Sequence, residues 1–195
     1  IESIRAIQDS ISIDLLSSET QFELLGQLDC DVILKQPVLS DELNSLAERL
    51  SYTESRLGSD NAEVMLLKKQ YSILEIKDYL LMQKVSDKCE IKPVSILYFY
   101  SNTGDCAECT RAGEVLTYLR QTYPDLRVYS FDYNLDLSAL QTLIALREVH
   151  KPLPAFVINA RRTIYGFKTV DEMQTLIPEL KSLATTTSAT TTSQR

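Results

Sequence analysis

The chain has 195 residues, a formal net charge of -7 and 44% hydrophobic residues, which suffices for a buried core in one or two domains. The acidic balance argues against nucleic acid or an anionic membrane surface as the main partner, because both are bound through basic faces. No apolar run in the sequence approaches the roughly 20 residues that span a bilayer.

Helices are predicted for the first 90 residues. Apolar side chains recur at helical spacing over 2 to 26. A second helix begins with Ser40 as its N-terminal cap and ends at Gly58, and a third, longer helix follows. We expect the last two to form an antiparallel helical hairpin. Residues 1–90 are therefore predicted to be an all-α N-terminal domain.

Two cysteines flank the predicted hairpin, Cys30 before it and Cys89 after it. A disulfide between them would close the open end of the hairpin and contribute up to about 4 kcal/mol in the chain-entropy model. The alternative is two unrelated buried thiols. A structural disulfide would imply an oxidising compartment outside the cytoplasm. Because the chain begins at Ile1 rather than Met, we also expect a removed N-terminal segment carrying a signal peptide or a membrane anchor.

The strongest chemical signal lies between residues 94 and 109. An apolar, β-rich run breaks around Gly104 and is followed by a C-x-x-C at Cys106 and Cys109, after which helical spacing continues to Tyr123. The unpaired N–H groups at a helix N-terminus stabilise a thiolate, the reactive form of cysteine. Cys109 lies about one turn further on, close enough to attack a mixed disulfide formed at Cys106 and release the partner.

The remaining sequence continues the alternation of strands and helices. Strands are predicted at 126–133, 155–159 and 163–167, and helices at 138–149 and 170–183. The order β-α-β-α-β-β-α, together with the C-x-x-C, resembles the thioredoxin-like fold family over about residues 91–182. This resemblance implies a four-stranded mixed sheet. We therefore expect a thioredoxin-like domain over 91–183, followed by a disordered Thr/Ser-rich tail over 184–195.

The resemblance also implies a site. In this family a cis-proline stands at the head of the third strand and faces the cysteines, so Pro154 is expected to be cis and opposite the C-x-x-C. The backbone of Leu153 would then hydrogen-bond an extended substrate segment. The implied activity is disulfide exchange with protein substrates, with Cys106 as nucleophile, Cys109 as resolving thiol and no organic cofactor.

Two features depart from the family pattern. Asp105 and Glu108 flank the nucleophile, and each would disfavour a nearby thiolate, so we expect an intermediate to reducing potential. The buried acid that many thioredoxins keep on the preceding strand is replaced by Tyr100. Glu108 and Asp132 are then the candidates for the proton acceptor of Cys109.

Other interpretations of the C-x-x-C stay open. Zinc sites use the same spacing, but the remaining ligands, Cys30, Cys89 and His150, are scattered along the chain, so no metal is expected. The first hypothesis is an exported oxidoreductase, periplasmic or at the cell surface, that acts on protein thiols and disulfides with an unidentified redox partner. The second is a non-catalytic binding or scaffold protein in which the hairpin recruits a partner and the disulfide is static.

Overall fold

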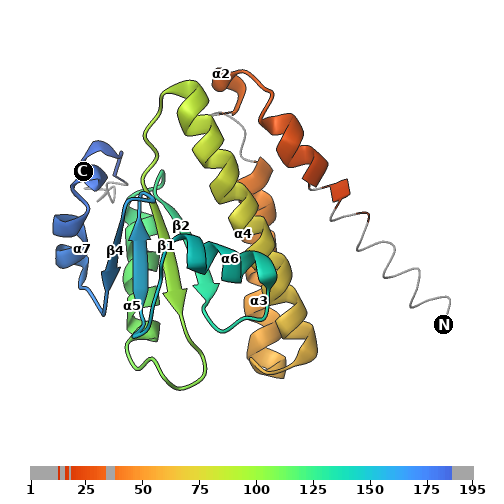
Figure 1. The fold of residues 1–195 in the computed structure, drawn as a ribbon, viewed down its shortest axis with the longest axis vertical. Coiled ribbons are helices and arrows are strands. Elements are labelled where there is room, and N and C mark those ends of the chain that lie inside the picture. Colours follow the sequence, from red (N-terminus) through yellow and green to blue (C-terminus); the bar gives the residue numbers. More distant parts are fainter. Residues whose placement is uncertain (1–12, 14–15, 18, 34–37, 186–195) are drawn as a thin grey trace, which may run out of the picture.

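The computed structural model describes residues 13, 16–17, 19–33 and 38–185 (Figure 1). Residues 186–195 of the predicted tail and residues 2–12, 14–15 and 18 of the first predicted helix lie outside the described residues. Residues 19–25 are helical. The elements that follow are α2 Cys30–Ile33, α3 Val38–Leu57, α4 Ala62–Cys89, β1 Ser95–Tyr100, α5 Cys109–Thr122, β2 Arg127–Asp132, α6 Ser138–Leu146, β3 Ala155–Ile158, β4 Arg162–Tyr165, α7 Val170–Leu176 and the 3₁₀ helix η1 Pro178–Ser182.

The four strands form one mixed sheet in the order β2-β1-β3-β4. Strand β1 pairs in parallel with β2 and antiparallel with β3, and β3 pairs antiparallel with β4. The sequence of β1, Ser-Ile-Leu-Tyr-Phe-Tyr, is nearly unbroken in apolar and aromatic residues, as expected of a strand covered on both faces. The four-stranded mixed sheet predicted from the sequence is confirmed.

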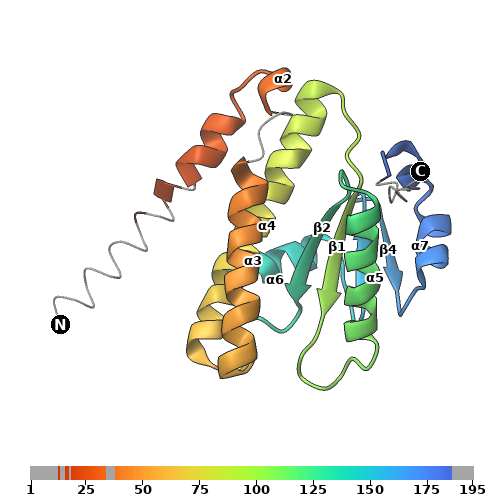
Figure 2. The ribbon, with the colours of Figure 1, turned by 180° about the vertical axis from the view of Figure 1, so that it is seen from behind.

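Helices cover both faces of this sheet (Figures 1 and 2). Alternate residues of β1 enter two separate apolar clusters, because successive side chains of a strand point to opposite faces. Ile96 and Tyr98 join the cluster with α5 and α7, whereas Leu97 and Phe99 join the cluster with α6 and part of α4. The sheet is therefore the middle layer of three.

Helix α4 lies along β2, which is an edge strand of the sheet, and also contacts α6. N–H groups that point away from an edge strand need acceptors. The N–H of Ser130 donates to the Glu75 carboxylate at 3.0 Å. The Asp78 carboxylate accepts from the Tyr129 hydroxyl at 2.6 Å and from the Arg127 guanidinium at 2.9 Å. Carboxylates of α4 thus cover an edge that a further strand would otherwise pair with.

Helix α3 packs on another side of α4. Lys68 of α4 is only 4% exposed, and its ammonium pairs with Glu54 of α3 at 2.9 Å. A buried charge needs such a partner. Because neighbours lie on more than one side, α4 buries the polar residues Lys68, Ser72, Glu75 and Asp78 as well as apolar ones.

Two helices end earlier than the sequence predicts. Helix α6 stops at Leu146, and Glu148 takes a left-handed φ of 51°, which does not continue a right-handed helix. Helix α7 stops at Leu176, because Pro178 has no N–H to donate and disfavours the helical conformation of the residue before it. The segment from Pro178 onward forms the 3₁₀ helix instead.

A disulfide joins Cys30, the first residue of α2, to Cys89, the last residue of α4. The two Cα atoms are 5.6 Å apart and the sequence separation is 59. Beside it, the Lys88 ammonium donates to the Leu28 carbonyl at 2.6 Å. This is the pairing that the sequence predicts, and it holds the segment before α3 against the C-terminal end of α4.

Candidate active site at Cys106 and Cys109

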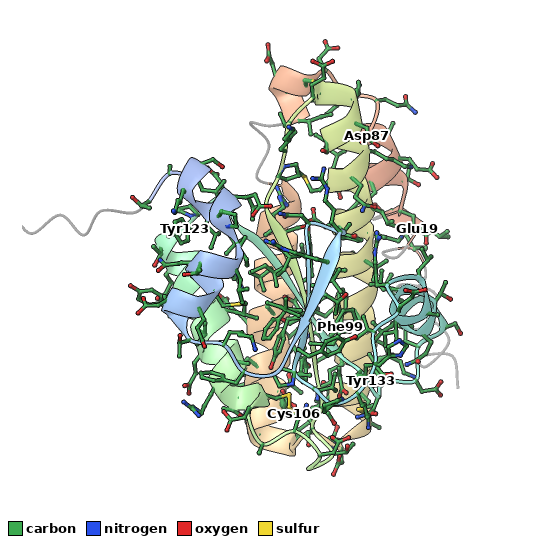
Figure 3. The ribbon with its side chains drawn as sticks, turned by 60° about the vertical axis from the view of Figure 1, so that its left-hand side comes forward. Glu19, Asp87, Phe99, Cys106, Tyr123 and Tyr133 are labelled. Carbon is green, nitrogen blue, oxygen red and sulfur yellow. A yellow bond between two sulfur atoms is a disulfide. The ribbon has the colours of Figure 1, made fainter. Side chains whose placement is uncertain are left out.

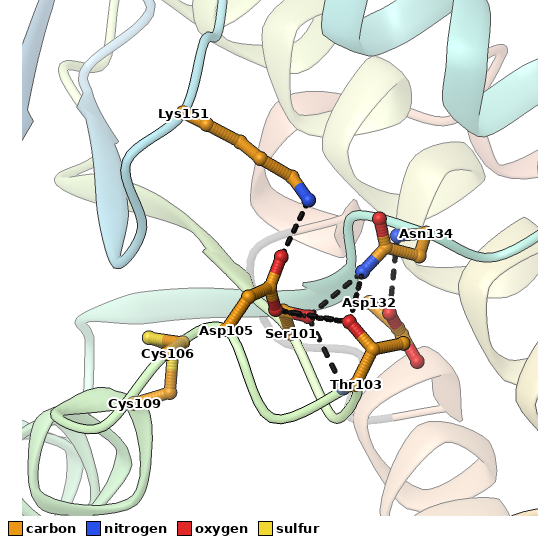
Figure 4. Close-up of polar contacts among 8 residues, drawn as sticks. All are labelled: Ser101, Thr103, Asp105, Cys106, Cys109, Asp132, Asn134 and Lys151. Carbon is orange, nitrogen blue, oxygen red and sulfur yellow. Dashed lines mark hydrogen bonds and ion pairs between the residues drawn. A yellow bond between two sulfur atoms is a disulfide. The ribbon is translucent and has the colours of Figure 1, made fainter.

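A second disulfide joins Cys106 and Cys109 where β1 leads into α5 (Figures 3 and 4). Cys109 is the first residue of α5, and Cys106 lies in the loop just before it. In this loop Gly104 has a φ of 83°, a left-handed conformation that glycine adopts without strain. The loop therefore turns the chain from the sheet into the helix and places both sulfur atoms at the helix N-terminus.

The two cysteines differ in exposure. Cys109 is only 6% exposed and belongs to the apolar cluster on the α6 face of the sheet. The hydroxyl of Tyr98, from β1, donates to the Cys109 carbonyl at 2.5 Å and fixes the start of α5 to the sheet. Cys106 is half-buried in the loop. A sulfur atom of another molecule can therefore reach Cys106 more easily than Cys109.

The segment before β3 lies beside the cysteines. Leu153 belongs to the same apolar cluster as Cys109, and Cys106 packs against that cluster. The peptide bond before Pro154 is cis, as the resemblance implies, and the bond before Pro152 is also cis, which was not expected. The fold thus places the predicted substrate-binding residue Leu153 in the same apolar cluster as Cys109.

Three side chains hold the Asp105 carboxylate, next to Cys106 (Figure 4). The Lys151 ammonium lies 2.5 Å from its Oδ2. The hydroxyls of Ser101 and Thr103 donate to its Oδ1, the latter at 3.0 Å. Hydrogen bonding by Lys151, and then by the two hydroxyls, holds the pKa of Asp105 well below its usual range. The carboxylate is therefore ionised and paired at neutral pH.

Glu108, the other carboxylate beside the cysteines, is paired as well. Its Oε2 lies 2.8 Å from Nη1 of Arg111, three residues along α5. The prediction that Asp105 and Glu108 oppose a thiolate at Cys106 assumes two unpaired negative charges. Each is paired with a cation, so its effect on a thiolate at Cys106 is weaker than the sequence alone predicts, and the reducing potential stays a prediction.

No protein-family model matches the chain, and no curated protein matches it. One similar solved structure is oxidised thioredoxin O2 from Arabidopsis thaliana. The two chains are 23% identical, the match covers 54% of this chain and 88% of that chain, and the TM-score is 0.40. A likeness this distant carries no argument about function, so the description of the fold rests on the strand order and pairing given above.

Neither carboxylate that the sequence suggests as a proton acceptor lies free beside Cys109. Glu108 is in the ion pair described above. Oδ1 of Asp132 accepts the backbone N–H of Asn134 at 3.1 Å, and the side chain lies on the far side of Asp105 from the disulfide (Figure 4). Burial raises the pKa of Asp132.

Sequence reasoning missed three polar side chains of the site, Lys151, Ser101 and Thr103. Asn134 extends their network, because its Nδ2 donates to the Ser101 hydroxyl at 2.7 Å. One signal for Lys151 was present: it stands two residues before Leu153, in the segment that the resemblance places beside the cysteines. Short polar residues that close a turn onto an aspartate are a second signal.

The side chains that the sequence offers as zinc ligands do not gather at one place in the described part of the chain. Among the described residues, no group of three or more His, Cys, Asp and Glu side chains could hold a metal ion. All cysteines are in the two disulfides. His150 is exposed, and its backbone N–H donates to the Tyr165 hydroxyl at 3.3 Å. Over the same described part of the chain, no helix combines the length and hydropathy needed to cross a bilayer.

Proposed function

We propose that the chain is a thiol–disulfide oxidoreductase that exchanges disulfides with protein substrates through Cys106 and Cys109. The observation that carries this proposal is the unequal exposure of the pair, with Cys106 half-buried in a loop and Cys109 only 6% exposed in the core. An accessible sulfur at a helix N-terminus is suited to attack, because the helix end stabilises its thiolate. A buried neighbouring sulfur is suited to resolve the product.

The exchange balances in sulfur bonds and electrons. In the reduced protein, the Cys106 thiolate attacks one sulfur of a substrate disulfide, forms a mixed disulfide and releases the first substrate thiolate. Cys109, once deprotonated, attacks Sγ of Cys106, releases the second substrate thiolate and leaves the Cys106–Cys109 disulfide. Two electrons pass to the substrate, and a separate redox partner returns them. The reverse sequence oxidises a substrate dithiol, and the sulfur atoms alone carry the electrons in both directions.

The substrate segment is proposed to bind at Leu153 and Pro154. The contact of Leu153 with the cluster that holds Cys109 supports this assignment. A substrate chain that passes along Leu153 would bring its own sulfur to the half-buried Cys106 rather than to Cys109.

The proposal includes a location outside the cytoplasm, in the periplasm or at the cell surface. The support is the Cys30–Cys89 disulfide, because structural disulfides persist in oxidising compartments and are rare in the cytosol. Alkylation of intact cells with a membrane-impermeant reagent, after mild reduction, tests the location. Labelling of Cys106 in intact cells supports it, and labelling only after lysis contradicts it.

The test of the activity is the reduction of insulin by dithiothreitol, followed as turbidity, with the protein as catalyst. The wild type should accelerate the reaction, and Cys106→Ser should not. Cys109→Ser should accumulate a mixed disulfide with the substrate on a non-reducing gel, because the resolving thiol is missing. The Cys30→Ser/Cys89→Ser variant is the control and should retain activity. Equal rates for the wild type and Cys106→Ser would contradict the proposal.

A non-catalytic binding protein is the second candidate. The observation in its favour is that helix α4 and the helical residues 19–25 carry exposed apolar side chains, among them Leu24 (57% exposed), Leu66 (50%) and Leu80 (48%). Single exposed apolar residues are common, so this observation is weaker than the geometry of the cysteines. The insulin assay separates the two candidates, because a static disulfide gives no acceleration in the wild type.

A further inference from the structure

Asp105 and Lys151 connect two segments that both border the cysteines. Asp105 directly precedes Cys106 in the loop after β1, and Lys151 lies in the loop before β3 (Figure 4). Their charged atoms are 2.5 Å apart across a sequence separation of 46. The side chain of Lys151 is 48% exposed and that of Asp105 is 37% exposed. The ion pair therefore lies at the surface, next in sequence to the sulfur atom proposed to react.

Neighbouring groups hold both ends of the pair. The loop hydroxyls bond Oδ1 of Asp105 and leave Oδ2 to Lys151. The Asn134 amide in turn holds the Ser101 hydroxyl at 2.7 Å. The Lys151 ammonium lies 5.8 Å from the centre of the Tyr133 ring, within the range of a cation–π contact. The carboxylate and the ammonium thus have defined positions relative to the disulfide.

We propose that Lys151 is a positioning residue that favours the thiolate of Cys106 by neutralising the carboxylate of Asp105. This inference rests on the oxidoreductase function proposed above and names a group that tunes it. When the disulfide is reduced, negative charge develops on Cys106, the residue next to Asp105. Without Lys151 the carboxylate opposes that charge, and with Lys151 the two side chains have little net charge.

The other titratable groups near Cys106 in the chain or at the ends of the neighbouring elements have partners of their own or are exposed to solvent. On α5, Glu108 is paired with Arg111 at 2.8 Å. At the end of β2, Asp132 is bonded to a backbone N–H and lies beyond the ion pair (Figure 4). His150, next in sequence to Lys151, is exposed. Removal of the Lys151 charge therefore uncovers the carboxylate that precedes Cys106 and leaves the ion pair on α5 in place.

The test measures the pKa of Cys106 from the pH dependence of its alkylation by iodoacetamide. The Cys109→Ser protein is used, because Cys106 is then the one free thiol. Lys151→Met should raise the pKa of Cys106 by about 1 unit, so that the thiolate fraction at neutral pH falls by up to about tenfold. Lys151→Arg keeps the charge and should leave the pKa close to that of the parent.

Two further variants isolate the cause. In an Asp105→Asn background, Lys151→Met should shift the pKa of Cys106 little, because no carboxylate is left to uncover. Lys77→Met removes the lysine of an ion pair elsewhere in the molecule, 2.9 Å from Glu19, and should leave the pKa of Cys106 unchanged. Circular dichroism and thermal unfolding show whether each variant is folded.

An unchanged pKa of Cys106 in Lys151→Met overturns the inference. An equal shift with and without the Asp105 carboxylate also overturns it, because the effect then does not act through Asp105. The two proposals fail separately. A wild type that reduces insulin, with no shift in Lys151→Met, removes this inference alone. A wild type that does not accelerate insulin reduction removes the proposed function, whatever the pKa measurements show.

Discussion

Two regions can be compared: the helical region, up to the end of α4, and the loop end of the sheet, where β1 leads into α5. Each contains one disulfide and one carboxylate with a shifted pKa, but the surroundings of the two carboxylates are opposite. In the helical region, Cys30–Cys89 closes a separation of 59 residues, and Glu75 is 2% exposed against the edge strand. At the loop end, Cys106–Cys109 closes a separation of 3 residues, and Asp105 is exposed and ion-paired. In the helical region the disulfide and the carboxylate stabilise the fold. At the loop end, Cys106 and Asp105 are accessible to other molecules.

The surroundings explain the difference. Burial raises the pKa of Glu75 well above its ordinary value, even though the Ser130 N–H and the Tyr71 hydroxyl act in the opposite direction. Hydrogen bonds from Lys151 and the loop hydroxyls lower the pKa of Asp105. A disulfide across a long loop restricts the unfolded chain strongly, and one across a short loop restricts it less. Opening the second is therefore expected to destabilise the fold less than opening the first.

The largest expected effect separates the two disulfides by their contribution to stability. Cys30→Ser/Cys89→Ser should lower the free energy of unfolding by about 4 kcal/mol, because the unfolded chain loses a long closed loop. Cys106→Ser/Cys109→Ser should lower it by clearly less. Urea denaturation of both double variants measures the difference. Equal losses in the two variants would show that the disulfides do not differ in this way.

The sequence predicts the loop end of the sheet in outline, because the signals there are local. The apolar run of β1, the break around Gly104 and the C-x-x-C are contiguous, so their spacing alone locates the cysteines at a helix start. The ion pair of Asp105 with Lys151 is not local. It depends on a fold that brings together residues separated by 46 positions, which no spacing rule reveals.

In the helical region the sequence predicts the helices but does not predict which charged side chains are buried. Helical spacing predicts long helices there, but charged residues on a helix are normally expected to face solvent. Glu75 and Asp78 are 2% and 1% exposed, because β2 is an edge strand whose outward groups need partners. Their burial follows from the position of α4 beside β2, and the sequence of α4 does not specify which strand it will lie against.

An intermediate effect is expected at Glu75. Glu75→Ala should be less stable than Glu75→Gln by about 1–3 kcal/mol, because only glutamine retains an acceptor for the Ser130 N–H. The raised pKa of Glu75 also sets the direction of the pH dependence. The contribution of Glu75 to stability is fully present below its ordinary pKa of 4.5 and is lost as pH rises through its folded-state pKa. Relative to wild type, Glu75→Gln should therefore gain stability between pH 4.5 and 8.

Urea midpoints of the three proteins over this pH range measure both parts of the prediction. Both variants lack the charge of Glu75, so their difference reports the lost acceptor together with the buried side-chain volume that alanine removes. If the urea midpoints of the wild type and of Glu75→Gln changed in parallel with pH, the Glu75 carboxylate would not be the group that titrates.

The smallest effect is expected at Asp105, where stability should change with pH in the direction opposite to that at Glu75. Because the pKa of Asp105 is lowered in the folded protein, its contribution to stability is present above the ordinary value of 3.8 and is lost as pH falls. Asp105→Asn should therefore be slightly less stable than wild type at pH 6, and the difference should shrink only as pH falls below 3.8 toward the lowered folded-state pKa of Asp105. The effect is small because solvent and salt screen an exposed ion pair.

Urea midpoints at low and high salt measure this effect. Lys151→Met should reproduce the loss of stability at pH 6, because it removes the same ion pair. A difference that widens toward acid would contradict the pairing of Asp105 with Lys151, because a carboxylate stabilised by an ammonium loses that stabilisation on protonation.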